Sequence, residues 1–262
     1  MCAKTSGGSA FSTNQETALL DGAVDVVVHS LKDLPTSMPA GLALLPTPAH
    51  RQDVRDALCG SALADLPKGA RVGTGAPRRI GQLLALRPDL KMVPIRGNVP
   101  PRLGRLRGAD GLDAVVLAAA GLNRLGLSSA ISEHLPVGTF PPSPGQGALG
   151  IQVREGSEAA RLLADTGDQV LDAEVRAERA LLAELHGGCS VPIGAYSKAH
   201  RDGALTLSAQ VSAVGGSRHV TAQGFGSVHD PEKLGRRVAE ELLDQGAEVI
   251  LSAVRQRPPA AP

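Results

Sequence analysis

The chain has 262 residues, of which 42% are hydrophobic, 20% charged and only 2% aromatic, and its formal net charge is +1. This composition predicts two or three globular domains with real cores and excludes a disordered chain. A net charge near zero provides no global field that would draw the chain to nucleic acid or a membrane. The three cysteines lack CxxC spacing, and the longest uncharged apolar run, residues 114–122, is too short to cross a bilayer. We therefore expect a soluble, cytoplasmic protein without disulfides or a metal site.

The first strong element is a β-branched run at residues 24–29, which follows a loop at 4–9 and a short helix at 13–20. The run predicts a buried strand of a parallel sheet. Lys32 and Asp33 come directly after it, and ligands of open α/β sheets bind beyond the carboxyl ends of strands. A solvated Lys–Asp pair in a loop is the alternative interpretation.

Strand, loop and helix alternate after a proline-rich stretch at residues 35–48, which is typical of a hinge or crossover. A second domain is expected to begin near His50. The expected strands are 70–74, 91–95 and 114–117, and the expected helices are 78–86, 101–106 and 118–125. This alternation predicts βαβ units on a parallel sheet.

Nine basic side chains lie between residues 71 and 107, against the single acid Asp89. Arg78 and Arg79 open a helix after a strand end, and Arg102 lies in the first turn of the next helix. Because cations are unfavourable at a helix N-terminus, a bound anion explains their placement better than helix stability does. Four of the other basic residues in this segment are interpreted as a solvated outer face of the domain: Arg87, Lys91, Arg105 and Arg107.

The nature of that anion is narrowed by what the sequence lacks. With no Trp, one Tyr and three Phe, the chain offers few stacking platforms for single-stranded nucleic acid. The glycines at 73–75 are followed by Pro77 and two arginines rather than by a phosphate-binding motif, and the glycines at 145–147 fail the same test. Several carboxylates on a small or oligomeric organic anion fit best.

A single thiol, Cys189, stands in a turn between a helical pattern at 173–185 and an apolar strand. Two glycines and Pro192 define the turn, which is expected to hold the thiol out on a loop. His186 is the local cation that could promote a thiolate. A small buried residue after a helix C-cap is an equally open interpretation.

Six ordered motifs resemble those of the porphobilinogen deaminase family, also called hydroxymethylbilane synthase. They are VHSLKDLP at 28–35, RQDVRDA at 51–57, RGNV at 96–99, LAAAGLNRLG at 117–126, GQGA at 145–148 and GGCSVP at 187–192. Their order and spacing match the family from residue 4 to about residue 196, and the tail matches more weakly. Six ordered motifs are far more specific than any one of them.

The resemblance implies an α/β fold of two periplasmic-binding-protein-like domains with parallel-type mixed sheets plus a small α+β C-terminal domain. Domain 1 would comprise residues 1–47 and 148–166. Domain 2 would comprise residues 48–147 and would be the basic domain that binds cofactor and substrate. Domain 3, residues 167–262, would carry the attachment cysteine, with strands near 205–214 and 219–225 and a helix at 231–244. The active cleft would lie between the first two domains.

The resemblance also implies a monomeric transferase of tetrapyrrole (haem) biosynthesis, which condenses four porphobilinogen units head to tail, releases ammonia and yields hydroxymethylbilane. Cys189 would hold a dipyrromethane cofactor through a thioether bond, and Asp33 would be catalytic. The implied cofactor-binding residues are Lys4, Ser30, Lys32, Thr74, Arg78, Arg79, Asn98 and Gln146. The implied substrate-binding residues are Arg96, Arg102 and Arg124.

The sequence departs from the family in two places. Residues 75–77 read Gly-Ala-Pro where relatives commonly have Ser-Ser-Leu, so a serine contact to the cofactor is missing. Relatives also begin with a strand, helix and strand that carry an arginine and a serine, which nothing before Lys4 supplies. The chain is therefore expected to be part of a longer sequence or, alternatively, a truncated or degenerate homologue that is catalytically inactive and binds acidic small molecules in the interdomain cleft.

Overall fold

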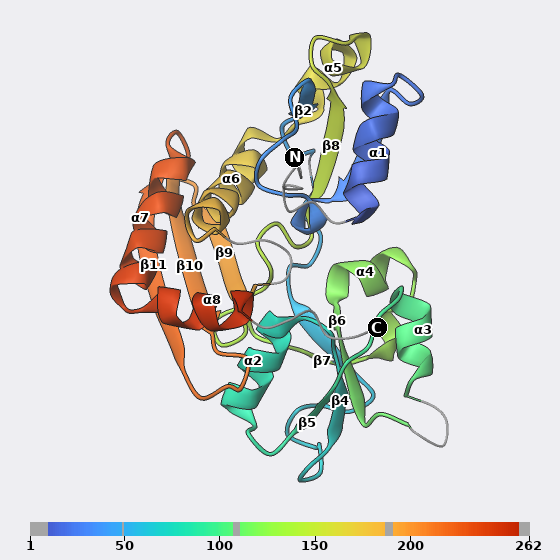
Figure 1. Cartoon of the computed structure of the whole chain (residues 1–262), viewed down its shortest axis with the longest axis vertical. Coiled ribbons are helices and arrows are strands. Elements are labelled where there is room, and N and C mark those ends of the chain that lie inside the picture. The colour runs from blue at the N-terminus through green and yellow to red at the C-terminus, as the bar shows by residue number, and fades with distance from the viewer. Residues whose placement is uncertain (1–9, 49, 107–110, 187–190, 257–262) are drawn as a thin grey trace.

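The computed structural model describes residues 10–48, 50–106, 111–186 and 191–256, which form three sheets with helices packed against them (Figure 1). The α-helices are α1 Ala10–Leu20, α2 Pro77–Leu86, α3 Val99–Gly104, α4 Ala119–Arg124, α5 Glu158–Leu163, α6 Gln169–Glu184, α7 Pro231–Asp244 and α8 Ala247–Arg255. The strands are β1 Val26–Ser30, β2 Leu42–Leu44, β3 Asp56–Cys59, β4 Arg71–Gly73, β5 Lys91–Val93, β6 Ala114–Ala118, β7 Ile131–His134, β8 Leu149–Arg154, β9 Ile193–Ala199, β10 Ala204–Ser212 and β11 His219–Ser227. Short 3-10 turns occur at η1 Leu31–Asp33, η2 Ser128–Ala130 and η3 Ala164–Thr166.

The middle of the chain forms a mixed sheet of strand order β5-β4-β6-β3-β7. β4 runs parallel to β5 and β6, which confirms the predicted βαβ units, whereas β3 pairs antiparallel with β6 and β7. Leu83 of α2 packs into the core on one face of the sheet, and Leu122 of α4 packs into the core on the other. The sheet is therefore a buried layer between helices, with α2 on one side and α3 and α4 on the other (Figure 1).

The sheet of order β1-β8-β2 corrects two expectations for the first strand, its burial and its parallel pairing. The predicted strand is present as β1, but its parallel pairing is wrong in the described part of the chain, because β8 runs between β1 and β2 and is antiparallel to both. Val28 is 58% exposed, because the described elements leave its face of β1 open. The stretch interpreted as a hinge contains β2, whose first residue, Leu42, is 2% exposed. A strand of this length gives no periodic signal strong enough to be read among four prolines.

The C-terminal sheet, β11-β10-β9, is antiparallel and packs on α6 and α7, as a small α+β domain requires. α7 has the predicted bounds, with Pro231 in the first helical turn, where the missing N–H costs nothing. α6 begins at Gln169, four residues earlier than expected, because the Asp168 carboxylate accepts from the backbone N–H groups of residues 170 and 171. The mixed sheets and this antiparallel unit confirm the α/β fold class.

Candidate functional site

The carboxyl ends of β4, β5 and β6 meet at one edge of the five-stranded sheet, because the three strands run parallel. Thr74 directly follows β4, and Arg96 and Asn98 come soon after β5. Pro77 starts α2 with a φ already suited to a helix, and this places Arg78 and Arg79 in its first turn. The fold therefore gathers the predicted polar and cationic residues of domain 2 at the edge where α/β sheets bind ligands.

Arg78 and Arg79 are only 4% and 5% exposed, and both bind a carboxylate of the chain itself. Arg78 Nη2 donates to Asp56 Oδ2 at 2.6 Å, and Arg79 Nη2 donates to Asp56 Oδ1 at 2.6 Å. Their remaining contacts include backbone carbonyls, Pro141 for Arg78 at 2.9 Å and Val116 for Arg79 at 3.0 Å. Asp56 therefore neutralises part of the charge of these arginines, and the expectation that a bound anion accounts for their placement stays a prediction.

Asp56 is fully buried at the start of β3 and was not identified from the sequence as a site residue. Burial alone would raise the pKa of this carboxyl, but the charges of Arg78 and Arg79 outweigh burial and hold the pKa below its usual range. The available signal was an acid directly in front of an apolar run at 57–59. An acid in that position needs a cationic partner inside the fold.

Lys32 reaches the same cluster from the first sheet through Gln146. Lys32 Nζ donates to Gln146 Oε1 at 3.0 Å, and Gln146 Nε2 donates to Asp56 Oδ1 at 3.0 Å. The loop before β8 comes this close because Gly145 has a φ of +75°, and a Cβ there would lie 3.3 Å from the backbone nitrogen of Lys32. Four predicted site residues, Lys32, Arg78, Arg79 and Gln146, are therefore joined through one residue that was not predicted.

The electrostatic environment of Lys32 is set by this cluster. Burial, followed by the positive charge of Arg79, lowers the pKa of Lys32 to about 8, and Asp33 and Asp56 act in the opposite direction. Asp33 is exposed at the end of η1. The turn after β1 therefore presents a carboxylate to solvent beside an ammonium group that loses its proton more easily than usual.

Arg102 of α3 is the predicted substrate-binding arginine with a free donor. Its Nε is buried and has no hydrogen-bond partner among the residues that the structure describes. Burial and the charge of Arg79 lower the pKa of Arg102, while Asp33 opposes them, so Arg79 and Asp33 each lie within electrostatic range of Arg102. A buried donor without an acceptor is costly unless a ligand supplies one.

Thr74 is placed inside the turn between β4 and α2. It is 1% exposed, and its hydroxyl accepts from the backbone nitrogen of Ala76 at 3.3 Å. Next to it, a Cβ on Gly75 would lie 2.8 Å from the carbonyl oxygen of Ile95. The departure from the family pattern at 75–77 thus coincides with a tightly packed turn that requires glycine at position 75.

The remaining predicted residues lie around this edge or outside the described part. Arg96, Asn98 and Arg124 are exposed, and Ser30 is half-buried at the end of β1. Asn98 precedes α3 as its N-cap, without a capping hydrogen bond from its side chain. Lys4 and Cys189 lie outside the described residues, so their predicted roles stay predictions.

The end of α6, which leads toward Cys189 along the chain, is held from the C-terminal helix. Arg255 Nη2 of α8 donates to the carbonyl oxygen of Leu185 at 2.8 Å, which is a favourable contact for a cation at a helix C-terminus. His186 follows with a φ of 48° and is exposed. Neither α8 nor the contact of Arg255 with Leu185 was predicted from the sequence.

A second ion pair links α6 to the loop of Gln146. Arg51 Nη1 and Nη2 each donate to the carboxylate of Glu178 at 2.8 Å, and Arg51 Nε donates to the carbonyl oxygen of Gln146 at 3.0 Å. Glu178 is fully buried and also accepts from the backbone nitrogens of Gly145 at 2.7 Å and Ser197 at 2.9 Å. This one carboxylate therefore connects the segment of Arg51, the loop of Gly145 and strand β9 to α6.

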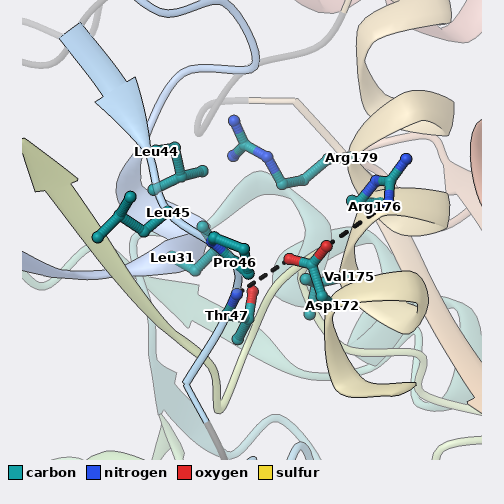
Figure 2. A pocket seen from close by; sticks show the side chains of 9 residues that line it. All are labelled: Leu31, Leu44, Leu45, Pro46, Thr47, Asp172, Val175, Arg176 and Arg179. Atoms are coloured by element: carbon teal, nitrogen blue, oxygen red, sulfur yellow. Dashed lines mark hydrogen bonds and ion pairs between the residues drawn. The ribbon is translucent and has the colours of Figure 1, made fainter. Parts of the chain in front are cut away.

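Two cavities border α6, and the cation cluster lines neither. The first, of about 260 Å³, is lined by Leu31, Leu44, Leu45, Pro46, Thr47, Asp172, Val175, Arg176 and Arg179 (Figure 2). Leu31, immediately before Lys32, forms part of its apolar floor, and Asp172 accepts from the backbone nitrogen of Thr47 at 2.9 Å. The second, of about 360 Å³, is lined by Arg51, Gln52, Asp53, Val54, Arg55, Val137, Glu174, Tyr196 and Lys198.

The structure also bears on the expected solvent exposure of Arg87, on metal ligands and on membrane-spanning helices. Arg87 is not simply solvated, because it pairs with Asp89 at 2.8 Å and donates to the carbonyl oxygen of Leu63 at 2.9 Å. Within the described ranges, no group of three or more His, Cys, Asp or Glu side chains could hold a metal ion. No helix in the same ranges is long and apolar enough to cross a membrane.

Two family models match most of the chain. Residues 1–162 match the model described as porphobilinogen deaminase, dipyromethane cofactor binding domain, and residues 173–244 match the porphobilinogen deaminase C-terminal domain. Among solved structures, a periplasmic binding protein of Salmonella typhimurium aligns over 64% of this chain and 70% of its own with 16% identity and a TM-score of 0.28, a similarity that supports no further argument.

Relatives over nearly the whole chain carry the same family name. Porphobilinogen deaminases of Geobacter metallireducens and Geobacter sulfurreducens are 48% and 47% identical to it over 258 residues, which cover 97% of this chain and 80% of each relative. That of Moorella thermoacetica is 45% identical over 94% of this chain and 79% of its own length. By its paired domain matches and by this level of identity, the chain belongs to the porphobilinogen deaminase (hydroxymethylbilane synthase) family.

Proposed function

We propose that this chain is a transferase that condenses four porphobilinogen units head to tail, with release of ammonia, to give hydroxymethylbilane for tetrapyrrole (haem) biosynthesis. The observation that carries the proposal is the convergence of Lys32, Arg79, Arg102 and Asp33 at the ligand-binding edge of a chain in this family. Cations gathered around one exposed carboxylate suit a ligand that is acidic at its periphery and becomes positive at its reacting centre.

The residues present fit the dipyrromethane cofactor, whose two pyrroles each carry an acetate and a propionate. The unpartnered Nε of Arg102 and the exposed guanidinium groups of Arg96 and Arg124 can receive carboxylates, and Lys32 adds an ammonium group nearby. Arg78 and Arg79 are buried and paired with Asp56, so their proposed contribution to cofactor binding is chiefly positive potential. Bound to the chain, the cofactor supplies the free α-carbon to which each new unit is joined.

The roles proposed for individual residues are those that the family resemblance implies. Asp33 stabilises the positive charge that develops on the substrate pyrrole, because its carboxylate is exposed beside Lys32 and Arg102. Cys189 provides the sulfur of the thioether bond. Additional contacts to the bound groups are assigned to Lys4, Ser30, Thr74, Asn98 and Gln146.

The three-domain division is part of the same proposal. β1, β2 and β8 fall in residues 1–47 and 148–166, the five-stranded sheet falls in 48–147, and the C-terminal sheet falls in 167–262. The five-stranded sheet and the C-terminal sheet have hydrophobic core clusters of their own, which supports two of the three units. The cluster next to the first sheet combines Leu31, Leu34 and Ala148 with Leu171 and Val175 of α6, so the first unit packs against the third. A monomer in the cytoplasm completes the proposal.

Mass spectrometry of the intact chain after incubation with porphobilinogen tests this function directly. We expect a covalent increase in mass that maps to Cys189 and is absent in Cys189→Ala. Cys59→Ala is the matched control, because Cys59 is a buried thiol of β3 whose pKa burial raises to about 11, so it should not react. The absence of an adduct on Cys189 would refute the proposal.

The catalytic role of Asp33 is tested in the same preparation. Asp33→Ala should abolish turnover while the adduct on Cys189 still forms. A non-catalytic binder of acidic small molecules would instead show saturable binding that survives both Asp33→Ala and Cys189→Ala. The sequence identity of this chain to relatives named as porphobilinogen deaminases does not favour that alternative.

A further inference from the structure

We propose that Asp56 is a positioning residue of this site: its carboxylate aligns the guanidinium groups of Arg78 and Arg79 directly and the ammonium group of Lys32 through Gln146. The inference deepens the proposed function and rests on it for the identity of the ligand. The contacts themselves are independent of that identity, because each is a hydrogen bond within the chain.

Asp56 is held firmly by its place in the five-stranded sheet. It begins β3, which lies between β6 and β7 in the five-stranded sheet. Its backbone carbonyl accepts from the nitrogen of Leu135 at 2.8 Å, and its side chain has no exposed surface. A carboxylate fixed on an interior strand is a more rigid reference point than one on a loop.

Asp56 provides one negative charge among three positive ones. Arg78, Arg79 and Lys32 are three cations at the same edge, and the positive charges of Arg79 and Arg78 act on Lys32. Without a counter-ion they would repel one another in a poorly solvated site. Asp56 accepts from both arginines and from Gln146, so one negative charge permits all three cations to approach.

The role proposed for Asp56 differs from that of a purely structural ion pair. A structural pair would end at the two arginines, whose donors are directed into the protein interior. The Gln146 amide instead extends the network to Lys32, which is half-buried and stands next to Asp33 in η1. Asp56 thereby acts on a group that faces the ligand edge, and prepositioned cations bind an anion with a smaller loss of side-chain freedom.

The test measures the protonation of Lys32 by NMR of side-chain lysine signals, with the signal identified by its loss in Lys32→Arg. The charged groups that act on Lys32 are Asp33 on its own turn, Asp56 on β3, and Arg78 and Arg79 on α2. Removing the Asp56 charge should therefore lower the pKa of Lys32 further below about 8. In the loaded enzyme, Asp56→Asn should also raise KM for porphobilinogen about tenfold or more, with a smaller effect on kcat.

Asp89→Asn is the matched control. Asp89 also pairs with an arginine of the same sheet unit, but its partner, Arg87, lies away from the cluster. This control should change neither the pKa of Lys32 nor KM. If Asp56→Asn folds and leaves both quantities unchanged, Asp56 is only structural and the inference is overturned.

Gln146→Leu provides a second variant should the loss of the buried charge prevent folding. It removes the acceptor of Lys32 and leaves the contacts between Asp56 and the arginines in place, so it should also lower the pKa of Lys32. An unchanged pKa in this variant overturns the inference. Because the lysine titration needs no turnover, a chain that fails to convert porphobilinogen would refute the proposed function without affecting this result.

Discussion

The ion pair of Arg51 and Glu178 allows the sharpest prediction of stability. Glu178→Ala removes a fully buried carboxylate that accepts from Arg51 through both guanidinium termini at 2.8 Å. It also removes the acceptor of the backbone nitrogens of Gly145 and Ser197, at 2.7 and 2.9 Å. The Arg51 side chain is only 8% exposed, and its next carboxylate, Glu174, is 3.8 Å away. Truncation therefore leaves one buried cation and two buried amides poorly paired.

The magnitude follows from these partners. Breaking one side of a buried ion pair costs about 3–5 kcal/mol, because an uncompensated charge remains. Each unsatisfied amide adds about 1–3 kcal/mol unless it finds a new acceptor. We expect a loss of at least about 4 kcal/mol in the free energy of unfolding, which lowers the melting temperature by about 10 °C in a chain of this size.

Thermal and urea unfolding, followed by circular dichroism, measure this loss. The matched control is Glu232→Ala, which removes the partner of Arg176 at 2.6 Å on side chains that are 35% and 50% exposed. This exposed pair should contribute less than about 1 kcal/mol. A Glu178→Ala chain that unfolds within about 1 kcal/mol of its parent would show that the Arg51 guanidinium reaches water, and it would refute the reasoning.

Three further predictions concern the ligand edge. Arg102→Met should raise KM for porphobilinogen about tenfold and lower stability little, because Arg102 Nε has no acceptor in the described chain to lose. Steady-state kinetics and a melting curve measure the two effects, and an unchanged KM would contradict the prediction. KM should also rise as pH increases through about 8, where Lys32 loses its proton and its attraction for carboxylates, whereas a flat KM between about pH 7 and 9.5 would exclude an ionic role for Lys32. Gly75→Ala should cost about 1–3 kcal/mol of stability by urea unfolding, since its Cβ would lie 2.8 Å from the carbonyl oxygen of Ile95; an unchanged midpoint would mean that the turn relaxes.

Local information in the sequence was sufficient to predict the elements that have a clear start signal and a regular apolar spacing. Pro231 and the spacing of Leu234, Val238 and Leu242 predict α7 with the bounds that the structure has, because helix starts and apolar periodicity are properties of neighbouring residues. The same holds for the parallel strands of the five-stranded sheet and for the basic segment around Arg78 and Arg79. These features depend on residues only a few positions apart.

The partners of those residues were decided by tertiary structure. Asp56 meets Arg78 across 22 positions, and Lys32 meets Gln146 across 114, distances in sequence over which no periodicity or spacing carries information. The antiparallel pairing of β1 was hidden for the same reason, since its neighbour β8 begins only at residue 149. The sequence by itself determined which charges this protein contains and where its strongly periodic helices lie. Only the packed chain decided which of those charges oppose one another, because burial forces a distant carboxylate and its cations into one poorly solvated space.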